Sequence, residues 1–130
     1  MIGLDTNVVV RYLTHDDPVQ TAAAEKVMGS LSSDSPGFLS LIVIVEVAWV
    51  LEVSYGFKKL ELEQVLEALL RSKELVVERA EIVWQALRKF RAGNADLADC
   101  LIERSGQAAE CEYTLTFDRK AVGAGMRLLV

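Results

Sequence analysis

The first ten residues constrain the fold of this chain more than any other stretch. Met1 to Leu4 form an apolar, strand-like segment that runs straight into Asp5-Thr6-Asn7, and apolar residues resume at Val8. Aspartate, threonine and asparagine favour turns and helix N-caps, so the pattern predicts a buried strand that delivers a carboxylate to its own carboxyl end. In open α/β sheets, ligands bind outside the carboxyl ends of the strands. We therefore expect a functional site around Asp5.

Strand-like and helix-like segments alternate along the rest of the chain. Helical patterns are predicted over about residues 7–13, 18–31, 41–53, 62–73 and 83–90 and after Asn94 or Asp96, and further strands over residues 38–39, 75–77, 113–117 and 126–130. This alternation predicts an α/β fold in which helices cover both faces of a mainly parallel central sheet, a three-layer α/β/α sandwich. We expect a single domain spanning residues 1–130.

An almost wholly apolar run occupies residues 41–53 and is interrupted by Glu46. Its composition suits either a buried strand or a buried helix, and its length favours a helix. It falls short of the ~20 residues that span a bilayer, so we expect no membrane segment. We expect Glu46 to lie among apolar side chains, where a metal ion or a buried arginine would have to offset the cost of burying its charge.

Composition limits the classes of function. The 130 residues are 52% hydrophobic and carry a net charge of −5, which argues against nucleic-acid binding by bulk electrostatics unless basic residues gather locally. The single histidine excludes a histidine metal cluster. Cys100 and Cys111 fit neither a disulfide framework nor a zinc spacing, and we expect both to be buried free thiols. No pattern at the amino terminus is typical of a signal peptide, so we expect a cytoplasmic protein.

Several carboxylates are predicted to reach the carboxyl edge of the sheet. Asp5 and Asp118 each follow a predicted strand, and for each of them a helix N-cap is the alternative role. Asp96 and Asp99 share one side of a predicted helix near its start, with Asp96 capping and Asp99 facing inward, whereas we expect Glu103 at the surface. Carboxylates that converge raise each other's pKa unless a hard cation lies among them, and oxygen-only ligands favour Mg²⁺ or Mn²⁺. Such a site can activate water for attack on a phosphodiester, in a nuclease or in a phosphatase.

Four short motifs, in this order, resemble those of the PIN domain. They are Asp5-Thr6-Asn7 after an amino-terminal strand, Glu46 within residues 40–47, the stretch 95–102 around Asp99, and residues 115–118 ending at Asp118. The resemblance covers essentially the whole chain. At this size the chain is similar to a VapC-type toxin of a type II toxin–antitoxin pair.

The resemblance implies a metal-dependent endoribonuclease, a hydrolase whose acidic residues hold one or two Mg²⁺ or Mn²⁺ ions and leave a 5′-phosphate and a 3′-hydroxyl. The residues that match the family's catalytic and metal-binding acidic quartet are Asp5, Glu46, Asp99 and Asp118. Accessory positions are Thr6, Asn7, Asp96 and Thr116. The family also implies a homodimer and a cognate VapB-type antitoxin that covers the active site.

Basic residues and leucines suggest where partners bind. Because the overall charge repels RNA, binding should depend on a few cations, for which the candidates are Arg11, Lys58, Lys59, Arg119 and Lys120. Part of the leucine-rich helical surface, residues 62–70 in particular, is the predicted homodimer contact, and a separate groove is expected to bind an antitoxin helix.

Three other classes of protein stay open. A phosphatase of the haloacid dehalogenase type needs a strand-end Asp-x-Asp pair, and Asn7 occupies the second place. A receiver-type signalling domain needs a central acceptor aspartate and a late lysine, and neither is evident. A degenerate PIN module that only binds partners is disfavoured because all four carboxylates are present.

Overall fold

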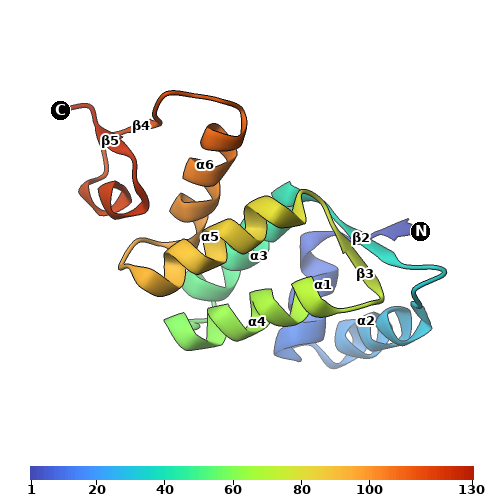
Figure 1. The fold of residues 1–130 in the computed structure, drawn as a ribbon. Coiled ribbons are helices and arrows are strands. Elements are labelled where there is room, and N and C mark those ends of the chain that lie inside the picture. Colours follow the sequence, from blue (N-terminus) through green and yellow to red (C-terminus); the bar gives the residue numbers. More distant parts are fainter. The chain divides into compact units, whose positions relative to one another are not determined.

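The structure is a computed structural model that describes residues 1–130, and it consists of two compact units, Met1–Glu78 and Arg79–Val130. Both units combine helices with parallel strands, which confirms the predicted α/β class (Figure 1).

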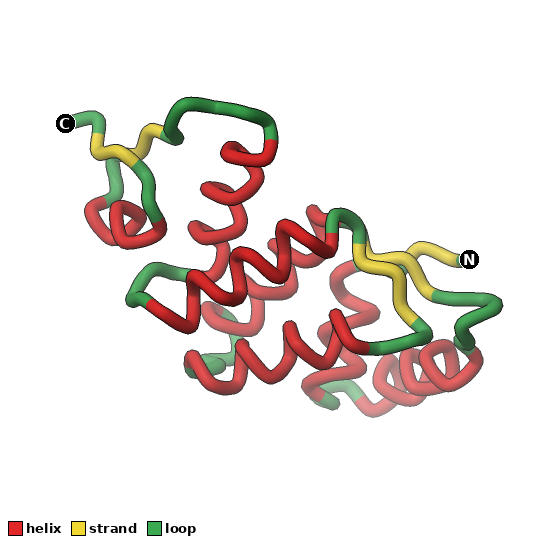
Figure 2. Tube along the Cα trace, viewed as in Figure 1, coloured by secondary structure: helices red, strands yellow, loops and turns green.

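The first unit is built on a three-stranded parallel sheet in the order β1-β2-β3 (Figure 2). Its strands are β1 (Ile2–Gly3), β2 (Gly37–Leu39) and β3 (Leu75–Val77). Ile2 lies opposite Gly37, which in turn lies opposite Leu75. Gly37 is packed so tightly that a Cβ there would lie 2.8 Å from Leu4 Cδ1. Parallel strands need crossover connections, and helices supply them here.

Four helices complete this unit, and their caps are readable in the sequence. They are α1 (Thr6–Thr14), α2 (Pro18–Ser30), α3 (Leu41–Val53) and α4 (Lys59–Arg71). The Asp17 carboxylate accepts from Gln20 N at 3.0 Å ahead of Pro18, and Ser40 Oγ accepts from Val43 N at 3.1 Å. Each contact satisfies an amide that the first helical turn leaves without a backbone partner.

Helix α3 spans the whole of the predicted run and is the most apolar element of the unit. One side of it is fully buried, at Ile44, Val47 and Leu51 among others. The opposite side is exposed although it is also apolar, since Ile42 and Trp49 are 73% and 55% exposed.

Helix α4 corrects one prediction. Leu62, Leu66 and Leu69 are buried within the chain, at 5% exposure or less. These three leucines therefore belong to the core and are not available as a homodimer contact.

The second unit contains α5 (Ala80–Ala92), α6 (Leu97–Ala108), β4 (Leu115–Thr116), the 3-10 helix η1 (Arg119–Ala124) and β5 (Arg127–Leu128). β4 and β5 pair in parallel, with η1 connecting them. The two strands are shorter than predicted, and η1 was not predicted. η1 ends at Gly125, whose φ of 101° lies in the left-handed region that glycine adopts without strain.

The apolar sides of α5 and α6 supply most of the buried residues of this unit, including Leu87 and Leu101, and η1 adds Ala121 and Ala124. Cys100 is buried there as predicted, and burial raises the pKa of its thiol to about 11. Cys111 is also a free thiol but is exposed, which corrects the prediction for that residue. No helix in the structure is long and apolar enough to cross a bilayer.

Candidate functional site

Asp5 and Glu46 are linked through one residue, Thr6. The Thr6 amide donates to Asp5 Oδ1 at 2.7 Å, and the Thr6 hydroxyl donates to Glu46 Oε1 at 2.6 Å. Asp5 is delivered by the end of β1, where the Leu4 side chain is buried and the Leu4 amide donates to the Phe38 carbonyl. Asp5 is therefore the N-cap of α1 and, at the same time, is linked through Thr6 to Glu46, which lies 40 residues beyond Thr6 in sequence.

Glu46 is exposed rather than buried, which corrects the expectation drawn from its apolar surroundings in the sequence. It lies on the same side of α3 as the exposed Ile42 and Trp49. Its charge is thus hydrated, and no buried arginine pairs with it. Its one hydrogen-bond partner is the Thr6 hydroxyl, which occupies Oε1 only, so Oε2 is open to a ligand.

A cavity of about 460 Å³ in the first unit contains these groups. It is lined by Asp5, Thr6, Asn7, Val10, Arg11, Glu46, Val50, Ser54 and Tyr55. The sequence predicted five of these residues as parts of the site, namely Asp5, Thr6, Asn7, Arg11 and Glu46. It missed Ser54 and Tyr55, which come from the turn after α3.

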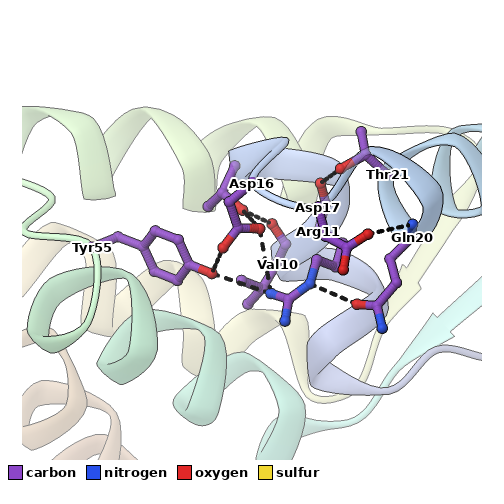
Figure 3. Close-up of polar contacts among 8 residues, drawn as sticks. Val10, Arg11, Asp16, Asp17, Gln20, Thr21 and Tyr55 are labelled. Carbon is purple, nitrogen blue, oxygen red and sulfur yellow. Dashed lines mark hydrogen bonds and ion pairs between the residues drawn. The ribbon is translucent and has the colours of Figure 1, made fainter.

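Arg11 is held on three sides (Figure 3). Its Nε donates to Gln20 Oε1 at 2.7 Å, its Nη1 donates to Tyr55 OH at 3.1 Å, and Nη1 also lies 3.5 Å from Asp16 Oδ1. The Tyr55 hydroxyl donates onward to Asp16 Oδ2 at 2.6 Å. This hydrogen bond is the main cause that holds the pKa of Asp16 below its usual range.

The second unit carries the other acidic residues. The pKa of Asp99 is raised by its partial burial first, then by the nearby charges of Asp96 and Asp118, while Lys120 lowers it. Asp118 caps η1 by accepting from Lys120 N at 2.9 Å, and Asp118 N donates to Thr116 Oγ1 at 3.0 Å. The three aspartates therefore form a cluster whose negative charges repel one another.

Asp96 differs from its predicted role. It is the N-cap residue of α6, but its side chain makes no capping hydrogen bond. Its Oδ1 instead lies 2.7 Å from Lys120 Nζ. Lys120 is thus placed beside carboxylates, and it is exposed, as are Lys58, Lys59 and Arg119.

Glu103 also differs from expectation. It is not a surface residue, since its side chain is 12% exposed, and it accepts from Lys89 Nζ at 2.8 Å and from Arg104 Nε at 2.7 Å. Lys89 Nζ also donates to the Ala124 carbonyl at 2.7 Å. This network fastens η1 to the two helices of the unit and is structural.

The donor chemistry of both clusters fits a hard divalent cation. Asp5, Thr6 and Glu46 offer carboxylate and hydroxyl oxygens, and Asp99 and Asp118 offer carboxylates alone. No three histidine, cysteine or acidic side chains gather closely enough in the structure to form a metal site by themselves. The predicted quartet is divided evenly, with two members in each unit.

Comparison with known proteins adds one match. The family model described as PIN domain matches residues 2–123, so the match extends over both units. No curated protein matches the chain. No solved structure matches it either.

Proposed function

The chain belongs to the PIN domain family, whose members are generally metal-dependent nucleases, and from this membership we propose that it is a Mg²⁺- or Mn²⁺-dependent endoribonuclease. We further propose that residues 1–130 act as a single PIN domain and that the protein is the VapC-type toxin of a toxin–antitoxin pair. The observation that carries the proposal is the pair of carboxylates, Asp5 and Glu46, linked through Thr6 in one cavity.

The four acidic residues of the quartet share one role in the proposed reaction. Asp5, Glu46, Asp99 and Asp118 are the metal ligands and catalytic residues of the proposal. When bound, the ion supplies Lewis acidity toward the phosphoryl oxygens and lowers the pKa of a water molecule. Thr6 holds Glu46 in one orientation through its hydroxyl, and Asn7 offers an amide to the same cavity.

Asp96 and Thr116 have supporting roles in this proposal. Thr116 Oγ1 accepts from the Asp118 amide and so fixes the backbone that carries this ligand. Asp96 holds Lys120 beside the cluster. Neither residue needs to touch the ion for these roles.

RNA is the proposed substrate, and its binding has to overcome the net charge of −5. Arg11, Lys58, Lys59 and Arg119 are the proposed cationic contacts. Lys120 is the weakest of the five candidates, because its ammonium group already pairs with Asp96.

The proposed partners are those of the family. They are a second copy of the chain and a VapB-type antitoxin that covers the active site. Sedimentation at micromolar concentration tests the homodimer, and the rate of cleavage with and without a co-expressed antitoxin tests the second partner. A monomer in the first case, or an antitoxin that binds without slowing cleavage in the second, contradicts the respective partner.

A cleavage assay tests the nuclease function. Mixed-sequence single-stranded RNA is incubated with the protein in two reactions, one with Mn²⁺ and one with excess EDTA. Mixed-sequence single-stranded DNA serves as the substrate control. We expect cleavage of the RNA only, ending at a 5′-phosphate, and no cleavage in EDTA. Undiminished RNA cleavage in EDTA would contradict the proposal.

A matched pair of variants distinguishes cleavage at the proposed site from cleavage by a contaminating nuclease. Asp5→Asn removes a negative ligand while keeping its shape, whereas Asp34→Asn makes the same chemical change in an exposed loop. We expect the first variant to lose two to three orders of magnitude in kcat/KM, about 3 to 4 kcal/mol at ~1.36 kcal/mol per decade. The second variant should match the unmodified protein. If both variants lost the same activity, or if neither lost any, Asp5 would have no role in the reaction.

A further inference from the structure

Arg11 lies on the wall between two cavities of the first unit. One is the cavity that contains Asp5 and Glu46, and Arg11 is the only cationic residue that lines it. The other has a volume of about 240 Å³ and is lined by Val8, Ala23, Ala24 and Val27 together with Asn7, Arg11 and Gln20. Arg11 and Asn7 are the residues common to both.

The guanidinium of Arg11 is fixed in position before any ligand arrives. Two of its nitrogens, Nε and Nη1, are engaged by Gln20 and Tyr55, and Nη2 donates no hydrogen bond within the chain. The side chain as a whole is 28% exposed and lines the cavity, so part of Arg11 is open to a ligand. An arginine held in this way loses little further rotamer freedom on binding, and its planar fork matches the oxygens of a phosphate.

Tyr55 determines how Arg11 is held. Its hydroxyl donates its proton to Asp16 at 2.6 Å, so the oxygen accepts from Arg11 Nη1 at 3.1 Å. Asp16 also accepts from Thr14 Oγ1 at 3.2 Å, which fixes the carboxylate at the end of the network. The Tyr55 hydroxyl therefore bridges the Arg11 guanidinium and the Asp16 carboxylate, both of which have further hydrogen-bond partners.

An RNA strand that reaches Asp5 and Glu46 must bring its phosphates into a cavity whose two carboxylates repel them to the extent that the proposed ion does not neutralise them. Like charges at this range disfavour binding unless a cation lies beside the path. Arg11 is the one lining residue that can provide it. The 240 Å³ cavity on its other side is largely apolar, so it offers no competing anion.

We propose that Arg11 binds the phosphodiester adjacent to the one that is cleaved, and that Tyr55 is the positioning residue that aims its guanidinium. This inference rests on the proposed nuclease function and names the group that brings RNA into the site. Arg11 is thus a residue of substrate binding, and its loss weakens the binding of RNA while leaving the chemical step intact.

Steady-state kinetics on single-stranded RNA with Mn²⁺ test the proposal with three variants and two controls. Arg11→Gln removes the charge, Arg11→Lys keeps the charge without the fork, and Tyr55→Phe removes only the hydroxyl. Arg71→Gln is the charge control, since Arg71 lines neither cavity. Tyr12→Phe is the hydroxyl control, since the Tyr12 hydroxyl makes no hydrogen bond in the structure. Thermal unfolding establishes that all five variants are folded.

We expect Arg11→Gln to raise KM at least tenfold and Tyr55→Phe about fivefold, with kcat within twofold of the unmodified protein. Arg11→Lys should recover part of the loss. The slope of log(kcat/KM) against log[salt] should become shallower by about 0.7 in Arg11→Gln, the value for one phosphate contact on a single strand. Both controls should leave KM unchanged. Unchanged KM and salt slope in Arg11→Gln, in a protein that cleaves RNA, would overturn the inference.

A binding measurement keeps the two proposals distinguishable. Fluorescence anisotropy with a labelled, mixed-sequence RNA oligomer is recorded for the same variants in EDTA, where no cleavage is expected, and cleavage of the same oligomer is assayed separately with Mn²⁺. If the unmodified protein binds the oligomer without cleaving it, the nuclease function fails, and a weaker affinity of Arg11→Gln still supports the contact. If the unmodified protein cleaves RNA and Arg11→Gln binds equally well, the contact fails and the nuclease function stands.

Discussion

Replacing Thr6 with valine tests whether the link between the two carboxylates of the first unit serves the reaction. Valine keeps the branched shape of threonine and removes only the hydroxyl, which donates to Glu46 Oε1 at 2.6 Å. Threonine and valine have similar helix propensities, and the Thr6 amide still donates to Asp5, so the fold and the N-cap should be unaffected. The change therefore frees Glu46 without removing it.

The length of the Thr6–Glu46 hydrogen bond sets the expected size of the loss in kcat/KM. A distance of 2.6 Å is typical of a hydroxyl that donates to an ionised carboxylate. Hydrogen bonds to charged groups contribute about 1.5–3 kcal/mol, and the exposure of Glu46 places this one at the lower end because water replaces the lost donor. At ~1.36 kcal/mol per decade, about 1.5 kcal/mol corresponds to a roughly tenfold lower kcat/KM.

The assay compares Thr6→Val with Thr6→Ser across a Mn²⁺ titration. Serine restores the hydroxyl, so it should recover most of the activity, while valine should lose about tenfold at every metal concentration or need more Mn²⁺ to reach its plateau. The reasoning is refuted if valine retains full activity while Asp5→Asn is inactive. It is equally refuted if serine is as impaired as valine, because the hydroxyl is then not the cause.

The remaining predictions concern the second acidic cluster, the core and the response to acid. At saturating Mn²⁺, Asp99→Asn should lower kcat/KM by two to three orders of magnitude. Asp96→Asn should have a smaller effect, because the Asp96 carboxylate pairs with a lysine. If Asp96→Asn were the more impaired variant, the roles assigned to the two residues would be reversed. Leu51→Ala should lower the free energy of unfolding in urea by about 2–5 kcal/mol, since Leu51 is fully buried, and the exposed Val53→Ala by under ~1 kcal/mol. Hydrogen bonds from a neighbouring arginine lower the pKa of Glu103, so its stabilisation is present above the ordinary value of 4.5 and is lost as the pH falls through the lowered pKa. Urea midpoints of Glu103→Gln should consequently decline less between neutral and acidic pH than those of the unmodified protein.

Local signals account for the parts of the fold that were predicted. The helix over residues 41–53 was identified with its bounds because Ser40 is a strong N-cap and the apolar run is too long for a typical strand. Asp17 followed by Pro18 likewise marks the start of α2. The 3-10 helix η1 was missed because residues 119–124 contain a glycine and no helical repeat long enough to recognise.

The sequence also misjudged the surroundings of Glu46. In a helix that is apolar on every side, periodicity does not reveal which side faces solvent, and here Ile42 and Trp49 accompany Glu46 on the exposed side. For Glu103 the error was the reverse. It was expected at the surface, but its side chain is mostly buried beside Lys89 and Arg104.

Candidate site residues were predictable where they belong to a sequence motif. They were not predictable where they depend on contacts between residues far apart in sequence. Asp5 and Thr6 follow from the strand-to-helix pattern, and their contact with Glu46 was expected from the resemblance. Tyr55 gave no signal, because its hydrogen bond to Arg11 joins residues 44 positions apart. Such pairings depend on how α1 packs against α3, which local sequence patterns do not specify.

The exposed side of α3 also has a spectroscopic consequence. Trp49 follows Glu46 by three positions, about one helical turn, and its indole is 55% exposed. Mn²⁺ is paramagnetic and quenches a nearby indole, whereas Mg²⁺ does not. In a Trp84→Phe background Trp49 is the only tryptophan left, since the chain has two. If Glu46 is a metal ligand, as proposed, emission from that variant should fall as Mn²⁺ is added and stay unchanged with Mg²⁺, with no RNA present and before any bond is cut.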